Sequence, residues 1–164
     1  MGSTFREAIL QTLYLSLSDV TAGHPLDDPY PLSFGEVFRG PLPQSTSKRL
    51  SVGIVPTKET KTAKIDLTTC FLDVAIDFRY RAQTGEVPAI IAETIGGMIL
   101  RRVLKDHTLN GLAIDVQDGG NVVDLDHPDT LTAEGSVFLT VHYRHDPHDP
   151  RTRFGEFAPD PVAT

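Results

Sequence analysis

The sequence predicts an α+β fold of two layers, in which two α-helices cover one face of a mostly antiparallel β-sheet. Three observations lead to this expectation. The segment 69–81 alternates apolar with charged residues, which is typical of a strand that is buried on one face only. The segments 5–17 and 87–105 instead carry apolar residues at helical spacing. The 164 residues, of which 40% are hydrophobic and 23% charged, suit one globular domain.

The first helix is expected over residues 5–17, because Thr4 and Glu7 have the spacing of a capping box. The second helix is expected over residues 87–105 and ends in a basic stretch, which complements the helix dipole. The pair Gly96-Gly97 lies in its interior, where each glycine costs about 1 kcal/mol relative to alanine. We therefore expect another backbone to pack closely there, within the subunit rather than between subunits.

A proline-rich connection, residues 19–47, follows the first helix and contains one short strand at 36–39. The next strand, 50–55, is expected to end at a proline, and the polar residues 57–64 then form a solvated hairpin tip. An uninterrupted strand over 65–81 would measure about 55 Å at about 3.3 Å per residue. Its first residues are therefore expected to bend away or to project outward.

The strand within 69–81 fixes the type of sheet. Because only one of its faces is apolar, the core lies on one side, which favours an antiparallel sheet over a doubly wound parallel one. The single cysteine, Cys70, lies on the apolar face, so we expect a buried, inert thiol and no disulfide. The apolar face holds Cys70, Leu72, Val74, Ile76, Phe78 and Tyr80, and the other face holds Asp73, Asp77, Arg79 and Arg81.

The rest of the chain predicts strands at 112–116, 122–125 and 136–144. Residues 146–164 contain four prolines and few apolar residues, which is typical of an extended tail. The predicted organisation is thus one α+β domain over residues 1–145, followed by this tail.

Charge and hydropathy argue against several classes of function. The formal net charge of −7 disfavours a protein that holds nucleic acid through a basic surface. No apolar run approaches the roughly 20 residues needed to cross a bilayer, and the first residues lack the blocks of a signal peptide. We therefore expect no membrane partner, and synthesis in a reducing cytoplasm.

Two clusters contain residue types that bind metals, but neither has the spacing of a metal site. In the first, His142 and His145 fall on opposite faces of a continued strand, and prolines interrupt the regular geometry. The second lacks the ligand register of an EF-hand loop. We expect no metal and no cofactor; a small metal- or ligand-binding domain stays open as an alternative. The clusters are His142, His145, Asp146, His148 and Asp149, and Asp115, Asp118, Asn121, Asp124, Asp126 and Asp129.

The sequence also lacks the motifs of nucleophilic catalysis and of phosphate binding. Asp73 and Asp77 share a face, but they lie about 13 Å apart along one strand, too far for the carboxylate pair of a glycosidase. Arg79 and Arg81 beside them indicate surface ion pairs, and we expect reversal of both arginines to glutamate to leave the fold intact. The prediction is therefore that the protein is not an enzyme.

The order of elements carries a resemblance to a known family. The chain reads helix, proline-rich connection, two strands, polar tip, long alternating strand, helix and further strands that end in Val141-His142-Tyr143. In this order and in its hydrophobic pattern, it resembles the tail terminator proteins of long-tailed bacteriophages, the lambda type, over most of residues 5–143. The connection 19–47 and the tail after Arg144 depart from the family. The matching segments are 5–10, 50–55, 70–80, 95–105 and 138–143.

The resemblance implies a structural protein of the virion, located where the tail meets the neck. Such subunits form a ring, usually hexameric, that caps the tail tube, ends its polymerisation and offers the attachment surface for the head connector. DNA passes through the lumen without specific binding. The implied partners are further copies of the chain, the tail tube protein and the connector protein. Another head-tail connector or a tube-like neck protein is the alternative within this class. The candidate subunit or partner contacts are Lys58, Glu59, Lys61, Lys64, Asp73, Asp77, Arg79, Arg81, Phe154 and Phe157.

Overall fold

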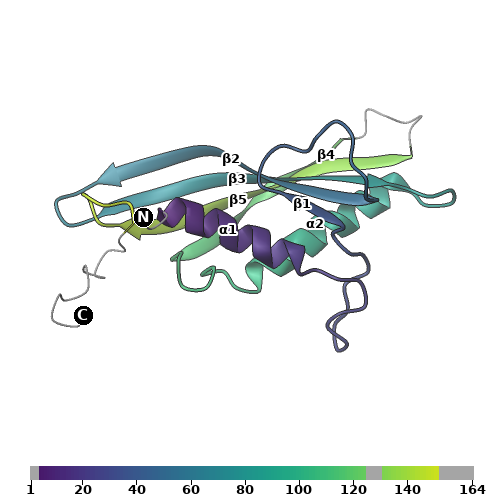
Figure 1. Cartoon of the computed structure of the whole chain (residues 1–164), viewed down its shortest axis with the longest axis horizontal. Coiled ribbons are helices and arrows are strands. Elements are labelled where there is room, and N and C mark those ends of the chain that lie inside the picture. The colour runs from purple at the N-terminus through teal and green to yellow at the C-terminus, as the bar shows by residue number, and fades with distance from the viewer. Residues whose placement is uncertain (1–3, 125–130, 152–164) are drawn as a thin grey trace.

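A computed structural model describes residues 4–124 and 131–151 of the chain. Over these residues the protein forms two helices and five strands, arranged as one sheet with the helices packed beneath it (Figure 1). The elements in chain order are α1 (Phe5–Ser18), β1 (Glu36–Phe38), β2 (Leu50–Ala63), β3 (Thr68–Arg81), α2 (Pro88–Leu104), β4 (Asp115–Asp124) and β5 (Thr132–His145).

The five strands have the spatial order β1-β2-β3-β5-β4. Every neighbouring pair is antiparallel except β1 and β2, which are parallel over three residues. β3 is the central strand, and its residues 68–81 pair with residues 132–145 of β5 without a break in register. The sheet is thus mixed but mostly antiparallel, and the predicted α+β fold class is confirmed.

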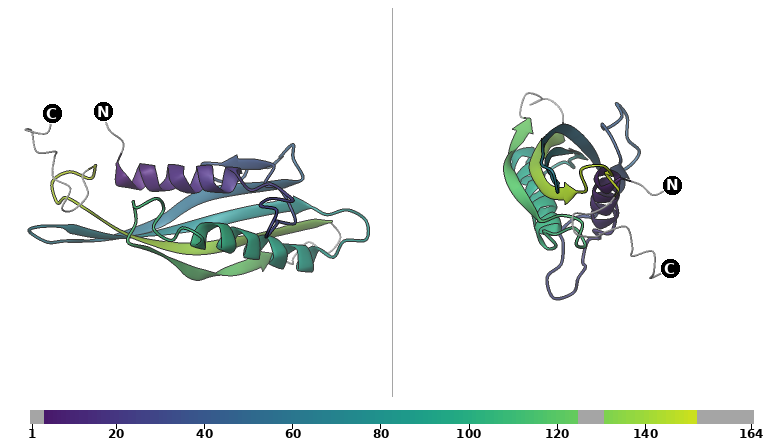
Figure 2. Two further views of the ribbon diagram at one scale, coloured as in Figure 1. Left: turned by 90° about the horizontal axis from the view of Figure 1, so that it is seen from below. Right: turned by 90° about the vertical axis from the view of Figure 1, so that its left-hand side faces the viewer.

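Both helices lie on the same face of the sheet, which curves around them (Figure 2). The α1 helix begins as the sequence predicts, because the Thr4 hydroxyl accepts a hydrogen bond of 3.1 Å from the Glu7 backbone N–H. The α2 helix begins with Pro88, whose missing N–H costs nothing at that position. Neither helix of the described part is both long and apolar enough to span a bilayer.

The core lies between the helices and one face of the sheet. The predicted apolar face of β3 is confirmed, with Leu72 and Ile76 fully buried. Cys70 is buried as a free thiol, and burial raises its pKa. The core residues from the helices and from β5 include Ile9, Leu13, Leu17, Ile95, Ile99, Val137, Leu139 and Val141.

The β2 strand does not end at Pro56 as the sequence predicts. It continues to Ala63, with a shift of register between Pro56 and Lys58, so residues 57–63 are strand rather than hairpin tip. Proline is tolerated because this part of β2 is an edge of the sheet, where a missing N–H breaks no ladder. The turn is residues 64–67, closed by a 2.8 Å hydrogen bond from the Lys64 N–H to the Leu67 carbonyl.

Two other boundaries differ from the prediction. The segments 112–116 and 122–125 were expected as separate strands. Residues 112–114 are not part of a strand, and residue 125 lies outside the described residues. Residues 115–124 form one strand, β4, with a register shift between Asp118 and Asn121. This shift accommodates the glycines between them as a bulge. β5 begins four residues earlier than expected, at Thr132 rather than Ser136, because β3 supplies a partner along its whole length.

The glycine pair of α2 does not have the close backbone neighbour that the sequence analysis expects. Gly96 is buried, and a Cβ there would lie 3.4 Å from the Asn121 amide nitrogen and 3.8 Å from a Val137 methyl group. A Cβ at Gly97 would meet nothing within 4 Å. Within the described residues, an alanine Cβ at Gly96 would thus make ordinary van der Waals contacts with side chains, and the expected close packing of another backbone is wrong at both positions.

The predicted tail begins at residue 146, and its first residues return to the start of α1. The Phe5 N–H donates a hydrogen bond of 3.0 Å to the Pro150 carbonyl, and Asp146 and Asp149 form an isolated bridge. Residues 152–164, with the candidate contacts Phe154 and Phe157, lie outside the described residues.

Candidate functional site

The charged face of β3 forms a ladder of polar pairs with β5. Three of the predicted contact residues each meet the β5 residue directly opposite them in the sheet. The Asp73 carboxylate accepts a hydrogen bond of 2.9 Å from the Thr140 hydroxyl, and that of Asp77 accepts one of 2.6 Å from the Ser136 hydroxyl. Arg79 Nε lies 3.0 Å from the Glu134 carboxylate. All three side chains therefore have a partner within the subunit, a hydroxyl group for each aspartate and a carboxylate for Arg79.

The connection between β1 and β2 lies over part of this same face. The Arg79 guanidinium donates a hydrogen bond of 2.7 Å to the Pro43 carbonyl, and that of Arg81 donates one of 3.1 Å to the Ser47 carbonyl. On β2, Gly53 leaves room for this connection, since a Cβ there would lie 2.6 Å from the Gly40 carbonyl oxygen. Arg79 and Arg81 thus hold a loop of their own chain, which the sequence analysis did not foresee.

A pocket of about 330 Å³ lies between this loop and the strands β4 and β5. Its polar lining includes Asp77, Arg79 and Glu134, each of which already has a partner in the ladder. A bound ligand would have to compete with these internal contacts, so the pocket does not suggest a ligand site.

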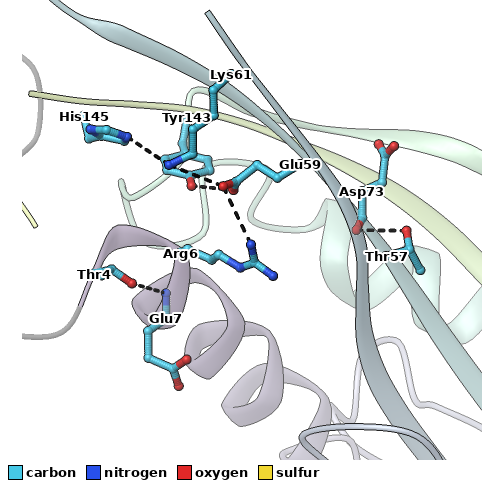
Figure 3. A network of polar contacts seen from close by, with 9 residues as sticks. All are labelled: Thr4, Arg6, Glu7, Thr57, Glu59, Lys61, Asp73, Tyr143 and His145. Atoms are coloured by element: carbon cyan, nitrogen blue, oxygen red, sulfur yellow. Dashed lines mark hydrogen bonds and ion pairs between the residues drawn. The ribbon is translucent and has the colours of Figure 1, made fainter. Parts of the chain in front are cut away.

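A second polar network holds the outer half of β2 to the rest of the protein (Figure 3). At its centre is Glu59, whose side chain is only 10% exposed. The Tyr143 hydroxyl donates to Glu59 Oε2 at 2.6 Å, and Lys61 Nζ lies 3.4 Å from Oε1. Arg6, on the first turn of α1, lies 3.7 Å from the same oxygen. One carboxylate thus links β2, β5 and α1.

His145 completes the network at the end of β5. Its Nδ1 lies 2.6 Å from the Asp146 carbonyl oxygen, which can only accept, so Nδ1 carries the proton. Nε2 is then the acceptor for the Lys61 ammonium group at 3.3 Å. Lys61 therefore joins the side chains of Glu59 and His145 on the helix-facing side of the sheet.

Tyr143 keeps its proton at all ordinary pH values. Burial and the hydrogen bond to Glu59 both raise the pKa of its hydroxyl far above the usual range. The tyrosine is 1% exposed and packs beside Cys70 on the core face. A buried hydroxyl that cannot ionise is suited to fixing the Glu59 carboxylate in place.

The four predicted contacts of the polar segment differ in their surroundings. Lys58 and Lys64 are exposed, and neither has an ion pair in the described part of the chain. Glu59 was expected on a solvated tip but is nearly buried, because it follows the strand alternation and turns to the helix-facing side opposite Leu72. Sequence reasoning missed Tyr143 and Arg6 as partners of Glu59, and His145 as a partner of Lys61. The only available signal was that a buried tyrosine hydroxyl usually has a hydrogen-bond partner.

The predicted histidine and aspartate cluster does not come together. His142 lies on the outer face, stacked on Phe71 with 4.5 Å between ring centroids, whereas His145 faces the helices. Burial, followed by the nearby Arg144, lowers the pKa of His142. Among residues 4–124 and 131–151, no group of three or more His, Cys, Asp or Glu side chains could hold a metal ion. Asp126 and Asp129 of the predicted acidic cluster lie outside these residues.

The sheet has two free edges that differ in charge. β1 covers β2 only at residues 51–53, so within the described chain no strand lies beside residues 54–63. On the opposite side, β4 is the last strand of the sheet that residues 4–124 and 131–151 form, and it pairs there with β5 alone. β4 carries three aspartates and no lysine or arginine, whereas the exposed charges on strand β2 are Lys58 and Lys61.

No protein-family model matches the chain, and no curated protein sequence matches it. Inferences about function therefore rest on its own residues and their arrangement.

Proposed function

We propose that this chain is the tail terminator of a long-tailed bacteriophage. In this role, copies of the subunit close into a ring on the end of the tail tube in the virion. The ring ends tube polymerisation and carries the attachment surface for the head connector. The protein is structural and has no catalytic step.

The observation that carries the proposal is the pair of unlike free edges on one sheet. A ring of identical subunits requires two different surfaces that complement each other, because each copy meets one neighbour with one surface and the next neighbour with the other. The edge of β2 beyond Gly53 and the edge of β4 are two such surfaces, at opposite sides of the same rigid sheet.

The shape and charge of the subunit also support the proposal. The hairpin of β2 and β3 extends beyond the first turn of α1 and gives the molecule an elongated form (Figure 1). Such an arm can reach a neighbouring subunit. The net charge of −7 suits a lumen through which DNA slides, because acidic walls repel phosphate and do not hold it.

The decisive experiment removes the gene from the phage that encodes it and examines the particles by negative-stain electron microscopy. A terminator predicts tails of excess and variable length, because nothing stops addition of tube subunits. Tails of normal length that are detached from heads would identify a connector instead. Particles with tails of normal length attached to heads would contradict both the terminator and the connector hypotheses.

A second experiment tests assembly directly with the purified full chain. Size-exclusion chromatography with light scattering is run over a range of concentrations, alone and with the tail tube protein of the same phage. The proposal predicts a closed oligomer of one defined mass in at least one condition. A chain that stays monomeric in every mixture and never associates with the tube protein would contradict it.

A further inference from the structure

The outer half of β2 is an unpaired strand edge of unusual length. Residues 54–63 extend for about 33 Å at about 3.3 Å per residue, with no described strand on their outer side. Along such an edge, alternate residues direct their N–H and C=O groups away from the sheet. Residues 57, 58 and 60–63 are all exposed. An edge of this kind is a template for another strand.

The edge of β4 is free in the same way but has the opposite charge. Its residues 117–122 are exposed. Asp115 and Asp124 lie on the outer face of the sheet, opposite His142 and Glu134, whereas Asp118 lies on the helix-facing side, opposite Leu139. On β2, Glu59 and Lys61 pair with each other on the helix-facing side, which leaves Lys58, on the outer face, as the charge without an ion pair on this edge within the described residues. The two edges are thus complementary in charge, although the whole chain is acidic.

We propose that a second copy of this chain occupies the β2 edge, and that it does so with the edge of its β4. This inference rests on the proposed function, because it identifies the surfaces through which the ring would form. The two sheets then join into one continuous sheet across the subunit boundary, with Lys58 on the outer face, which also carries Asp115 and Asp124 of the neighbouring β4.

The strand directions support this pairing. β2 is antiparallel to β3, β3 to β5 and β5 to β4, so β2 and β4 run in opposite directions within one subunit. Rotation about an axis along the strands keeps each direction unchanged. The β4 of a rotated copy therefore meets β2 as an antiparallel partner, the arrangement found in the rest of the sheet.

Charge also disfavours the symmetric alternatives. Two β2 edges in contact would bring lysines against lysines, and two β4 edges would bring aspartates against aspartates; like charges on facing strands are destabilising. A contact between unlike edges avoids this repulsion. It also repeats from copy to copy and can close into a ring, whereas contact between like edges stops at a dimer.

Cross-linking tests the contact. The full chain carries Thr60→Cys on the β2 edge together with Gln117→Cys on β4, and is treated with a short bis-maleimide linker that tolerates a small shift of register. Because Cys70 is fully buried, the native thiol stays silent. We expect a ladder of covalent oligomers up to the size of the closed ring. The matched control pairs Gln117→Cys with Thr94→Cys on the exposed side of α2 and yields at most dimers.

A charge exchange tests the same contact without cross-linker. Lys58→Glu, which sets a glutamate against the acidic β4, should raise the concentration needed for half-maximal assembly about tenfold. Gln117→Lys in the same chain should reverse most of that rise. Both positions are exposed and have no side-chain hydrogen bond in the described part of the molecule, so the fold is expected to tolerate both changes.

The outcomes separate this inference from the proposed function. Normal ring assembly with no ladder from the Thr60 and Gln117 pair, or with no response to charge exchange, would overturn the edge pairing and leave the terminator proposal standing. Failure of the unmodified chain to oligomerise, alone or on tail tubes, would overturn both.

Discussion

The Tyr143 hydroxyl and the Glu59 carboxylate, on strands separated by β3, are joined by a hydrogen bond of 2.6 Å. The bond passes over the helix-facing side of the sheet and connects the end of β5 to the outer half of β2. Within the described chain that half has no strand partner on its other side, so its position depends on β3 and on this bond together with the Lys61 and Arg6 contacts. The free edge of β2 is therefore held in a fixed place by side chains.

Tyr143→Phe removes the hydroxyl and should destabilise the protein by about 1–2 kcal/mol. The physical reason is that the Glu59 carboxylate stays nearly buried but loses the hydrogen bond from the Tyr143 hydroxyl. Urea unfolding followed by circular dichroism measures the change. Tyr14→Phe is the matched control, because Tyr14 is partly buried on α1 and its hydroxyl makes no hydrogen bond within the described chain. Equal stability of the two variants would show that the bond contributes nothing.

Substitution by alanine should raise the stability of the protein at one glycine and lower it at another. Gly97→Ala should stabilise the protein by about 0.5–1 kcal/mol, because the added methyl group meets open space and alanine favours the helix. Gly53→Ala should cost about 1–3 kcal/mol, because its Cβ would press against the Gly40 carbonyl. Thermal unfolding of both variants beside the parent measures the two shifts. A stable Gly53→Ala variant would mean that the loop over the sheet moves aside easily.

The fold could be predicted because one strong signal, alternation along 69–81, reports burial directly. The position of Leu72 and Asp73 on opposite faces follows from it and is confirmed. Strand ends were predicted less well. Pro56 alone predicts the end of a strand. However, β3 supplies hydrogen-bonding partners for β2 up to Ala63, and this tertiary pairing overrides the local preference.

The candidate site was predicted in composition but not in geometry. The segment 57–64 was expected to be solvated throughout, and an alternating strand turned Glu59 inward once β2 continued past Pro56. Arg79 was expected at the surface, but its contact with the Pro43 carbonyl joins residues 36 positions apart. No local pattern encodes such a contact, because it depends on where a long loop crosses the sheet.

Arg79→Ala should release the loop that lies over the outer face. The guanidinium that holds the Pro43 carbonyl is lost, and Glu134 loses its partner, for a cost of about 1–2 kcal/mol. Hydrogen exchange measured by mass spectrometry should become faster in peptides from residues 40–47. Arg144→Ala is the control, since Arg144 is exposed on β5 and makes no side-chain hydrogen bond in the described part.

Reversal of the same residue tests the geometry more severely. Arg79→Glu sets two carboxylates opposite each other across β3 and β5, because Glu134 is its direct partner. The sequence-based expectation was that reversal leaves the fold intact. The ladder instead leads us to expect a less stable protein, and Glu134→Arg in the same chain should restore part of the loss. Unchanged unfolding of Arg79→Glu would favour the sequence-based expectation.

Stability should decrease as the pH falls through the range in which histidine titrates. Burial and Arg144 lower the pKa of His142 in the folded protein below its ordinary value of 6.5. The unfolded chain therefore binds a proton at this site more readily than the folded protein does. The stability that depends on neutral His142 is complete above the unfolded pKa and declines as the pH drops below it.

His142→Phe should flatten this part of the pH profile, because phenylalanine does not titrate and can keep the stack on Phe71. It also removes Nε2, a buried nitrogen with no hydrogen-bond partner in the described molecule, so the variant should be at least as stable as the parent at neutral pH. Urea unfolding at a series of pH values from about 5 to 8 measures both effects. His148→Gln, at an exposed histidine, is the control. A profile for His142→Phe as steep as that of His148→Gln would assign the acid sensitivity to groups other than His142.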